Sequence, residues 1–161
     1  QIFLESSLFF SGMRPAVNVG LSVSRVGGDA QTKAMKKAAG SLRIDLAQYR
    51  EMEVFTQFSS DLDDATKEQL EYGSGLMELL KQPLGKPMSL ADKVITLCAA
   101  RHKVMLGIPT AKVKGFQMDM LSYFASAHPE IAREIEETKD LSKELSQKIV
   151  EIAEEFKKSR C

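Results

Sequence analysis

The sequence has little of the chemistry that usually marks a metal site or a disulfide framework. Of its 161 residues, two are cysteines, two are histidines and none is tryptophan. Neither Cys98 nor Cys161 belongs to a CxxC pair, and neither His102 nor His128 has a second ligand at metal-binding spacing. We therefore expect no bound metal, a buried free thiol at Cys98 and a loose thiol at Cys161.

Charge of one sign and long apolar runs are also missing. The 22 Lys and Arg residues balance 22 Asp and Glu residues, whereas a nucleic-acid binder carries a basic excess, so we expect no nucleic-acid partner. No apolar run approaches the roughly 18 residues that a membrane-spanning helix needs. The start, QIFLESSLFF, lacks the basic flank and the cleavage site of a signal peptide. Because the chain begins with Gln1 rather than Met, we interpret it as a fragment.

The sequence divides into two parts that differ in composition. Residues 1–28 are rich in Gly, Ser, Val and Phe, and the runs 1–5 and 15–24 favour short strands bounded by turns. If they are strands, they need a partner, either each other as a hairpin or a neighbouring copy, which would make a homo-oligomer through residues 1–28. Residues 29–161 are mostly helix formers. The predicted fold class is mainly α, a bundle of about five to six helices with a short β-containing N-terminal stub.

The spacing of apolar residues predicts where the helices lie. Apolar residues recur at steps of three and four over 29–58, which predicts one helix about 45 Å long. Its predicted inward face consists of Met35, Ala38, Leu42, Leu46, Tyr49, Met52, Phe55 and Phe58. Further helices are predicted over 65–81, after a cap at Ser89, from Thr110, over 130–138 and from Ser142. The inward faces of the two longest late helices are predicted to be Val113, Phe116, Met120 and Phe124, and Leu145, Ile149, Ile152 and Phe156.

Motifs for self-contained catalysis are weak. Gly85-Lys86 is followed by Pro87, so it is not a P-loop. Asp61-x-Asp63 begins like a calcium loop, but Thr66 stands where that loop needs glycine. The acidic cluster of residues 61–64 is better interpreted as a solvated loop or as a docking point for a basic partner. Whether the chain is an enzyme stays open from these residues alone.

Arg25 is the residue whose position most clearly suggests a chemical role. Ser22, Ser24 and two glycines predict a hydrophilic loop after a strand, with Arg25 at its tip just before a helix. A guanidinium in such a place offers forked donors to phosphate oxygens. The residues alone leave two interpretations open, a phosphate contact and an ordinary surface arginine.

A family resemblance bears on this choice. The segment RPAVNVGLSVSRVGG resembles the signature of alpha subunits of F-type ATP synthases, including the pattern P-A-V-N-x-x-x-S-x-S at residues 15–24. The resemblance continues through AQTKAMKKAAGSLRIDLAQYREMEVFTQF, SSDLDDAT and LLKQP. It covers essentially the whole chain and is most specific in the first half.

The resemblance implies a domain division and a role for Arg25. Residues 1–28 would be the C-terminal remnant of the nucleotide-binding domain, with strand, loop and arginine finger, and residues 29–161 the C-terminal helical domain. The P-loop would lie upstream. Arg25 matches the arginine finger that an alpha subunit lends to the catalytic site of its beta neighbour, where it stabilises charge on the transferred phosphoryl group.

The resemblance also implies binding residues. Phe9, Arg14, Pro15 and Gln82 match positions on the adenine side of the alpha subunit's own non-catalytic nucleotide, which would be ATP or ADP with Mg²⁺ in the whole subunit. Leu84 stands where that family often has a polar residue. The carboxylates Asp61, Asp63 and Asp64 match a loop near the central stalk.

The function that the resemblance implies is that of a regulatory, nucleotide-binding alpha subunit in proton- or sodium-driven ATP synthesis and hydrolysis. Its partners would be beta subunits and the central stalk (gamma) subunit. Its place would be the cytoplasmic face of the bacterial plasma membrane, as a peripheral part of the complex, or the equivalent side of an organelle inner membrane. For these residues alone we expect no activity and no tightly bound nucleotide. The alternative is a stand-alone helical module for protein–protein interaction.

Overall fold

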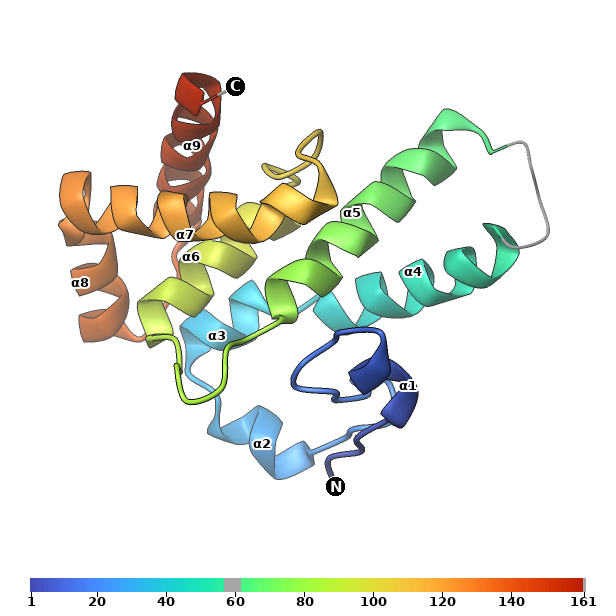
Figure 1. The fold of residues 1–161 in the computed structure, drawn as a ribbon. Coiled ribbons are helices and arrows are strands. Elements are labelled where there is room, and N and C mark those ends of the chain that lie inside the picture. The colour runs from blue at the N-terminus through green and yellow to red at the C-terminus, as the bar shows by residue number, and fades with distance from the viewer. Residues whose placement is uncertain (57–61, 161) are drawn as a thin grey trace.

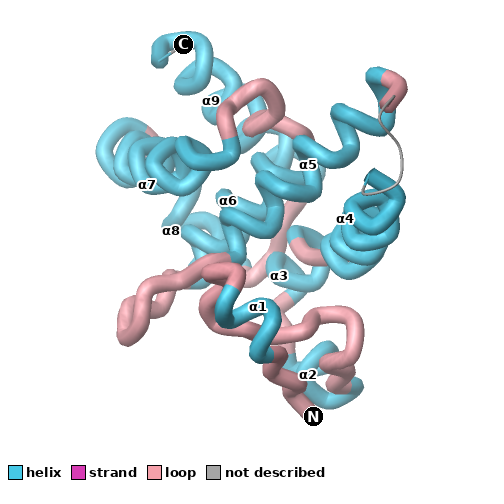
Figure 2. Tube along the Cα trace, turned by 45° about the vertical axis from the view of Figure 1, so that its right-hand side comes forward, coloured by secondary structure: helices cyan, strands magenta, loops and turns pink. Residues whose placement is uncertain are grey.

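The computed structural model describes residues 1–56 and 62–160, and these residues are mostly helical (Figure 1). This confirms the mainly α fold class. The helices are α1 (Ser6–Phe10), α2 (Arg25–Ala30), α3 (Lys33–Ala38), α4 (Leu42–Thr56), α5 (Asp64–Leu80), α6 (Leu90–Arg101), α7 (Thr110–Ala127), α8 (Pro129–Thr138) and α9 (Lys143–Arg160). Within the described ranges, the β structure consists of one isolated antiparallel bridge between Leu4 and Val17, and loops make up most of the N-terminal segment (Figure 2).

The core is organised around α6. Helices α3, α7, α8 and α9 all contact it, and eight of its 12 residues are buried. Its start is capped as predicted, because the Ser89 hydroxyl accepts a hydrogen bond from the amide of Asp92 at 3.0 Å. The predicted Cys98 thiol is buried here, and burial raises its pKa. Cys161 lies outside the described residues.

The late helices confirm the spacing argument. Helix α7 begins at Thr110, and its buried side chains include Val113, Met120 and Phe124, while Phe116 packs against the core from a partly buried position. Helix α9 begins at Lys143, one residue after the predicted start. It buries all four predicted side chains, which are Leu145, Ile149, Ile152 and Phe156.

The single long helix predicted over 29–58 is wrong. The chain forms α2, α3 and α4 there, with breaks after Ala30 and after Ala38. At the first break Thr32 has extended backbone angles, and its hydroxyl accepts a hydrogen bond from the amide of Met35 at 3.2 Å, so it starts a new helix. Gly40, a poor helix former, lies in the second break. The predicted end at Phe58 lies outside the described residues.

The predicted inward face nevertheless reaches the core. Ala38 and Leu46 are buried, and Met35 and Leu42 pack against the core from partly buried positions. The three- and four-residue steps therefore located four of the eight predicted side chains at the core. Tyr49 and Met52 are partly buried and do not belong to this core, and the side chains of Phe55 and Phe58 are outside the described part of the chain. The steps continue across two backbone breaks and so did not reveal them.

The N-terminal segment pairs mostly with itself. The amide of Glu5 donates to the carbonyl of Ala16 at 3.0 Å, and the amide of Asn18 donates to the carbonyl of Phe3 at 2.8 Å. The two expected strands, 1–5 and 15–24, are thus reduced to one bridge between Leu4 and Val17, and α1 lies between them in the sequence. Many large apolar side chains of this segment stay exposed, namely Ile2, Phe3, Leu4, Phe9, Phe10, Leu21, Val23 and Val26. Association between copies through this face stays a prediction.

Helices α4 and α5 form an antiparallel pair that extends to one side of the molecule (Figure 1). The Tyr72 hydroxyl donates a hydrogen bond to Asp45 at 3.0 Å across the pair, and burial and the Asp45 carboxylate together raise the pKa of Tyr72. Gly73 is buried directly against the ring of Tyr49, and a side-chain carbon at that position would overlap the ring.

A pair of glycine variants tests this close approach. We expect Gly73→Ala to lower the free energy of unfolding by about 1–3 kcal/mol, because the added methyl group must push the ring of Tyr49 away. The matched control is Gly75→Ala in the same helix, where an added carbon meets nothing within 4 Å and higher helix propensity should stabilise by about 0.5–1 kcal/mol. Urea unfolding followed by circular dichroism measures both. Equal effects of the two variants would contradict the packing argument.

Candidate functional site

Four of the predicted site residues lie together. Phe9, Arg14, Pro15 and Gln82 line one pocket of about 1030 Å³, which is formed by α1, the loop after it and the loop after α5. Its volume is at the upper end for small-molecule sites. Leu84 lies on the rim and is fully exposed.

Two contacts hold this pocket in shape. The amide of Gln82 donates a hydrogen bond to the carbonyl of Arg14 at 2.8 Å, which joins two segments that are far apart in the sequence. The guanidinium carbon of Arg14 lies 4.5 Å from the centre of the Phe9 ring, a cation–π contact. The pocket therefore offers an aromatic ring, a fixed cation and an exposed amide side chain to a planar ligand.

Arg25 lies elsewhere, as the first residue of α2 rather than at the tip of a loop. The side chain of Ser24 caps this helix by accepting a hydrogen bond from the amide of Gly27 at 2.9 Å. Arg25 is exposed, and within residues 1–56 and 62–160 its guanidinium has no hydrogen-bond or ion-pair partner. It is thus a free cation at the surface, available to a group outside the chain.

Asn18 has a structural role that the sequence did not reveal. It is buried, and its side-chain oxygen accepts hydrogen bonds from the amide of Leu21 at 3.0 Å and from Arg50 at 3.2 Å. Its side-chain nitrogen donates to Glu5. Arg43 adds a second tie by donating to the carbonyl of Gly20 at 3.3 Å. The segment that leads to Arg25 is therefore fixed to α4. The motif contained Asn18, but nothing in it indicated the two arginines.

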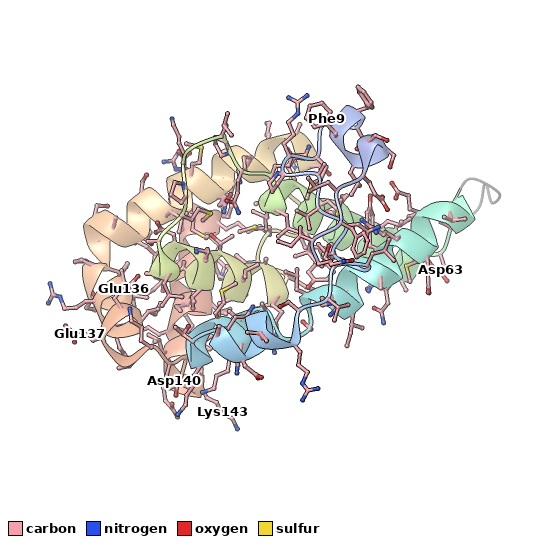
Figure 3. The ribbon with its side chains drawn as sticks, turned by 90° about the horizontal axis from the view of Figure 1, so that it is seen from below. Phe9, Asp63, Glu136, Glu137, Asp140 and Lys143 are labelled. Atoms are coloured by element: carbon pink, nitrogen blue, oxygen red, sulfur yellow. The ribbon has the colours of Figure 1, made fainter. Side chains whose placement is uncertain are left out.

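The predicted acidic cluster lies at the start of α5. Asp61 is outside the described residues, Asp63 caps the helix and Asp64 is its first residue. Hydrogen bonds from the side chain and the backbone amide of Thr66 lower the pKa of Asp63. Asp64 pairs with Lys67 at 3.3 Å. Figure 3 shows Asp63 at the free end of the α4–α5 pair, well separated from Phe9. The adenine-side residues and the acidic residues thus form separate surfaces.

No group of three or more His, Cys, Asp or Glu side chains is arranged to hold a metal ion in the part of the chain that the structure describes. Among the helices formed by residues 1–56 and 62–160, none is both long enough and apolar enough to cross a membrane.

Comparison with known proteins places this fold. The family model described as "ATP synthase alpha/beta chain, C terminal domain" matches residues 31–156, which is most of the chain. The chain belongs to this family.

Relatives in this family extend the match to the N-terminal segment. The chain is 53% identical over 158 residues to a protein of Clostridium kluyveri, 54% over 157 residues to one of Acetivibrio thermocellus and 49% over 158 residues to one of Mycolicibacterium smegmatis, each named ATP synthase subunit alpha. Each match covers 98% of this chain. It spans only 31%, 31% and 29% of those relatives. The chain thus corresponds to a C-terminal portion of this family's alpha subunits.

The Asn18 contacts lead to a prediction about the segment that carries Arg25. We expect Asn18→Ala to cost about 1–3 kcal/mol of stability, because it removes a buried acceptor that serves Leu21 and Arg50. Hydrogen exchange of the Leu21 amide should accelerate strongly. Ser7→Ala is the control, since Ser7 is exposed in the same segment. Unchanged protection at Leu21 would show that Asn18 does not hold this loop.

Proposed function

We propose that the chain works as part of an alpha subunit of a rotary ATP synthase and supplies Arg25 in trans to the catalytic site of a neighbouring beta subunit. The observation that carries the proposal is the exposed guanidinium of Arg25, which has no partner within the described residues. The matching relatives, which bear the name of this subunit, support it. As a proposed division, residues 1–28 end the nucleotide-binding domain and residues 29–161 form the helical domain, in keeping with the family match at 31–156.

The local structure suits this role. Phosphoryl transfer spreads negative charge over the γ-phosphate oxygens, and a forked cation held at the right place stabilises that charge. Ser24 caps the start of α2, and the hydrogen bond between Arg50 and Asn18 holds the loop before it. The backbone of Arg25 is therefore held in place, and only its side chain is free to move. In such a site, residues other than these would bind the metal and the nucleotide phosphates.

The pocket at Phe9 is proposed as the adenine end of the alpha subunit's non-catalytic nucleotide site. The Phe9 ring and Pro15 offer apolar faces to a base, and the side-chain amide of Gln82 can hydrogen-bond a base edge. Arg14 already covers part of the Phe9 ring, so it would share the aromatic face with the base or move aside. With Leu84 on the rim, that edge of the pocket offers no side-chain hydrogen bond.

The free end of the α4–α5 pair is proposed to meet the central stalk. Asp63 and Asp64 are exposed there, and Asp61 belongs to the same acidic cluster in the sequence. Single exposed ion pairs contribute little, so several such contacts would have to act together. In this proposal the partners are beta and gamma subunits. The subunit would be peripheral to a membrane, on the cytoplasmic face in a bacterium or the equivalent face in an organelle, and would serve proton- or sodium-driven ATP synthesis.

The first test concerns Arg25 in the assembled complex. We expect Arg25→Ala to slow ATP hydrolysis on the order of 10³-fold or more while nucleotide binding is largely kept. Arg25→Lys should also fail, because a point charge does not reproduce the guanidinium fork. Arg133→Ala, at an exposed arginine of α8, is the matched control and should turn over normally. Normal hydrolysis by either Arg25 variant would overturn the proposed role.

The second test concerns the chain by itself. We expect no ATP hydrolysis and no saturable heat when Mg-ATP at micromolar concentration is titrated calorimetrically, because only the adenine-side residues of a nucleotide site are present. A dissociation constant below about 10 μM, which corresponds to roughly −7 kcal/mol, would contradict this expectation. A parallel unfolding curve shows that the titrated chain is folded.

A further inference from the structure

A second cavity lies away from the proposed nucleotide pocket. It has a volume of about 710 Å³ and is formed by α3, the end of α6 and the start of α9. The basic side chains that line it are Lys36, Lys37, Arg101, His102 and Lys143, and the Cys98 thiol lines it as well. Of the described residues in its lining, none is an aspartate or a glutamate. In a chain with no net charge, such a concave basic surface is a local concentration of positive potential.

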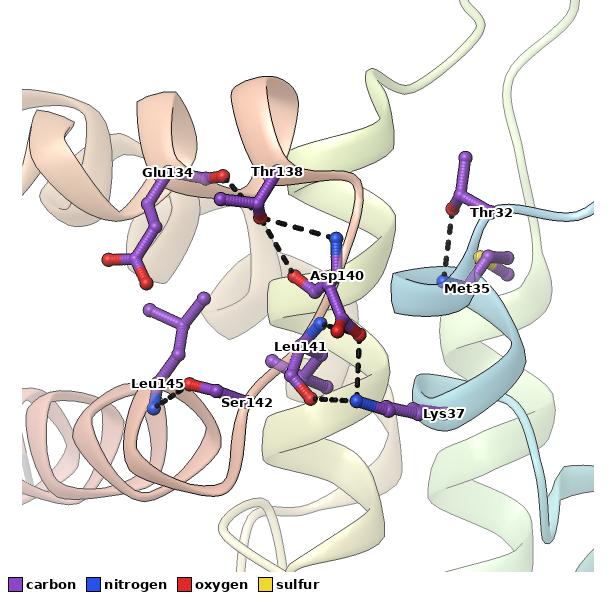
Figure 4. A network of polar contacts seen from close by, with 9 residues as sticks. All are labelled: Thr32, Met35, Lys37, Glu134, Thr138, Asp140, Leu141, Ser142 and Leu145. Atoms are coloured by element: carbon purple, nitrogen blue, oxygen red, sulfur yellow. Dashed lines mark hydrogen bonds and ion pairs between the residues drawn. The ribbon is translucent and has the colours of Figure 1, made fainter.

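Part of this basic set is held in place by contacts within the chain. Lys37 donates to the carbonyl of Leu141 at 3.0 Å and pairs with Asp140 at 2.7 Å (Figure 4). Arg101 donates to the carbonyl of Lys37. Hydrogen bonds from Lys37 and from the amide of Leu141 lower the pKa of Asp140. Lys37 is therefore largely neutralised, and it fixes α3 against the segment before α9.

The remaining cations are available to a ligand. Lys36 has only a 4.0 Å contact with Asp29, and Lys143 has no hydrogen bond or ion pair within the described residues. Lys143 is also the first residue of an 18-residue helix, where the helix dipole adds partial positive charge. The apolar side chains of Leu141 and Val150 also line the cavity. The site thus combines free cations, a helix start and an apolar surface.

We propose that this cavity binds a small molecule with more than one phosphate charge. A concave site of this volume suits a small ligand rather than an extended protein segment. Multivalent phosphates are favoured because the lysines on α3 and α9 approach the cavity from two sides and could contact two phosphoryl groups at once. The anion is either inorganic, such as pyrophosphate, or the phosphate end of an organic molecule, for which Leu141 and Val150 would provide an apolar contact.

The experiment is a titration of the ¹⁵N-labelled 161-residue chain followed by amide NMR, with pyrophosphate, a sugar bisphosphate and a hexaglutamate peptide as probes at one ionic strength. We expect saturable shifts that cluster at Lys36, Ser142 and Lys143. The double variant Lys36→Gln/Lys143→Gln should weaken the apparent affinity about tenfold, because it removes two charges that face the anion. The amide spectrum itself reports whether each variant is folded.

The matched control is Lys93→Gln/Lys158→Gln. It removes the same charge from α6 and α9, two helices that form the cavity, at the ends of those helices that lie remote from it. We expect it to bind the probes like the unmodified chain. A sugar bisphosphate that binds more tightly than pyrophosphate would support an organic ligand, and the reverse order would support an inorganic one. Three results would overturn the proposal: shifts that do not saturate, equal loss in both double variants, or tighter binding of hexaglutamate than of either phosphate.

Discussion

The burial of α6 on several sides is the constraint on which the rest of the helical structure depends. Ala91, Val94 and Ile95 have almost no exposed surface, and neither do Cys98, Ala99 and Ala100, so neighbouring helices must cover this helix around much of its circumference. Helices α3, α7, α8 and α9 do so, each with its own apolar face. The buried Thr96 hydroxyl of α6 also has a hydrogen-bond partner, since the side chain of Gln117 in α7 donates to it at 3.2 Å. The order of the late helices follows from the need to surround this one.

The sequence predicted α6, α7, α8 and α9 well, because each combines a local start signal with one apolar face. Ser89 and Pro109 mark two starts, and the three- and four-residue steps in α7 and α9 locate the buried side chains. Residues 29–56 were harder, because spacing reports burial and not backbone continuity. The break at Thr32 depends on a cap that competes with a continuing helix, and such a cap contributes only about 1 kcal/mol.

The candidate site was predictable in its residues but not in its construction. The family resemblance brought Phe9 and Gln82 to attention, yet no local pattern shows that loops on either side of α4 and α5 meet there. The hydrogen bond between the Gln82 amide and the Arg14 carbonyl makes that connection, and its backbone atoms carry no signature in the sequence. The same holds for Arg50, which looks like an ordinary charge on a helix and yet holds Asn18 in place. Long-range polar contacts are therefore the part that the sequence alone could not supply.

The absence of a side chain at Gly73 has a mechanical consequence. Because the backbone of α5 lies directly against the ring of Tyr49, and the Tyr72 hydroxyl is hydrogen-bonded to Asp45, α4 and α5 are held to each other by contacts between the helices themselves. The pair carries acidic residues at its free end, and Arg43 and Arg50 of α4 are hydrogen-bonded to the loop before Arg25. A force on one helix of the pair would therefore also act on the other, and the bonds of Arg43 and Arg50 connect α4 to the segment that carries Arg25.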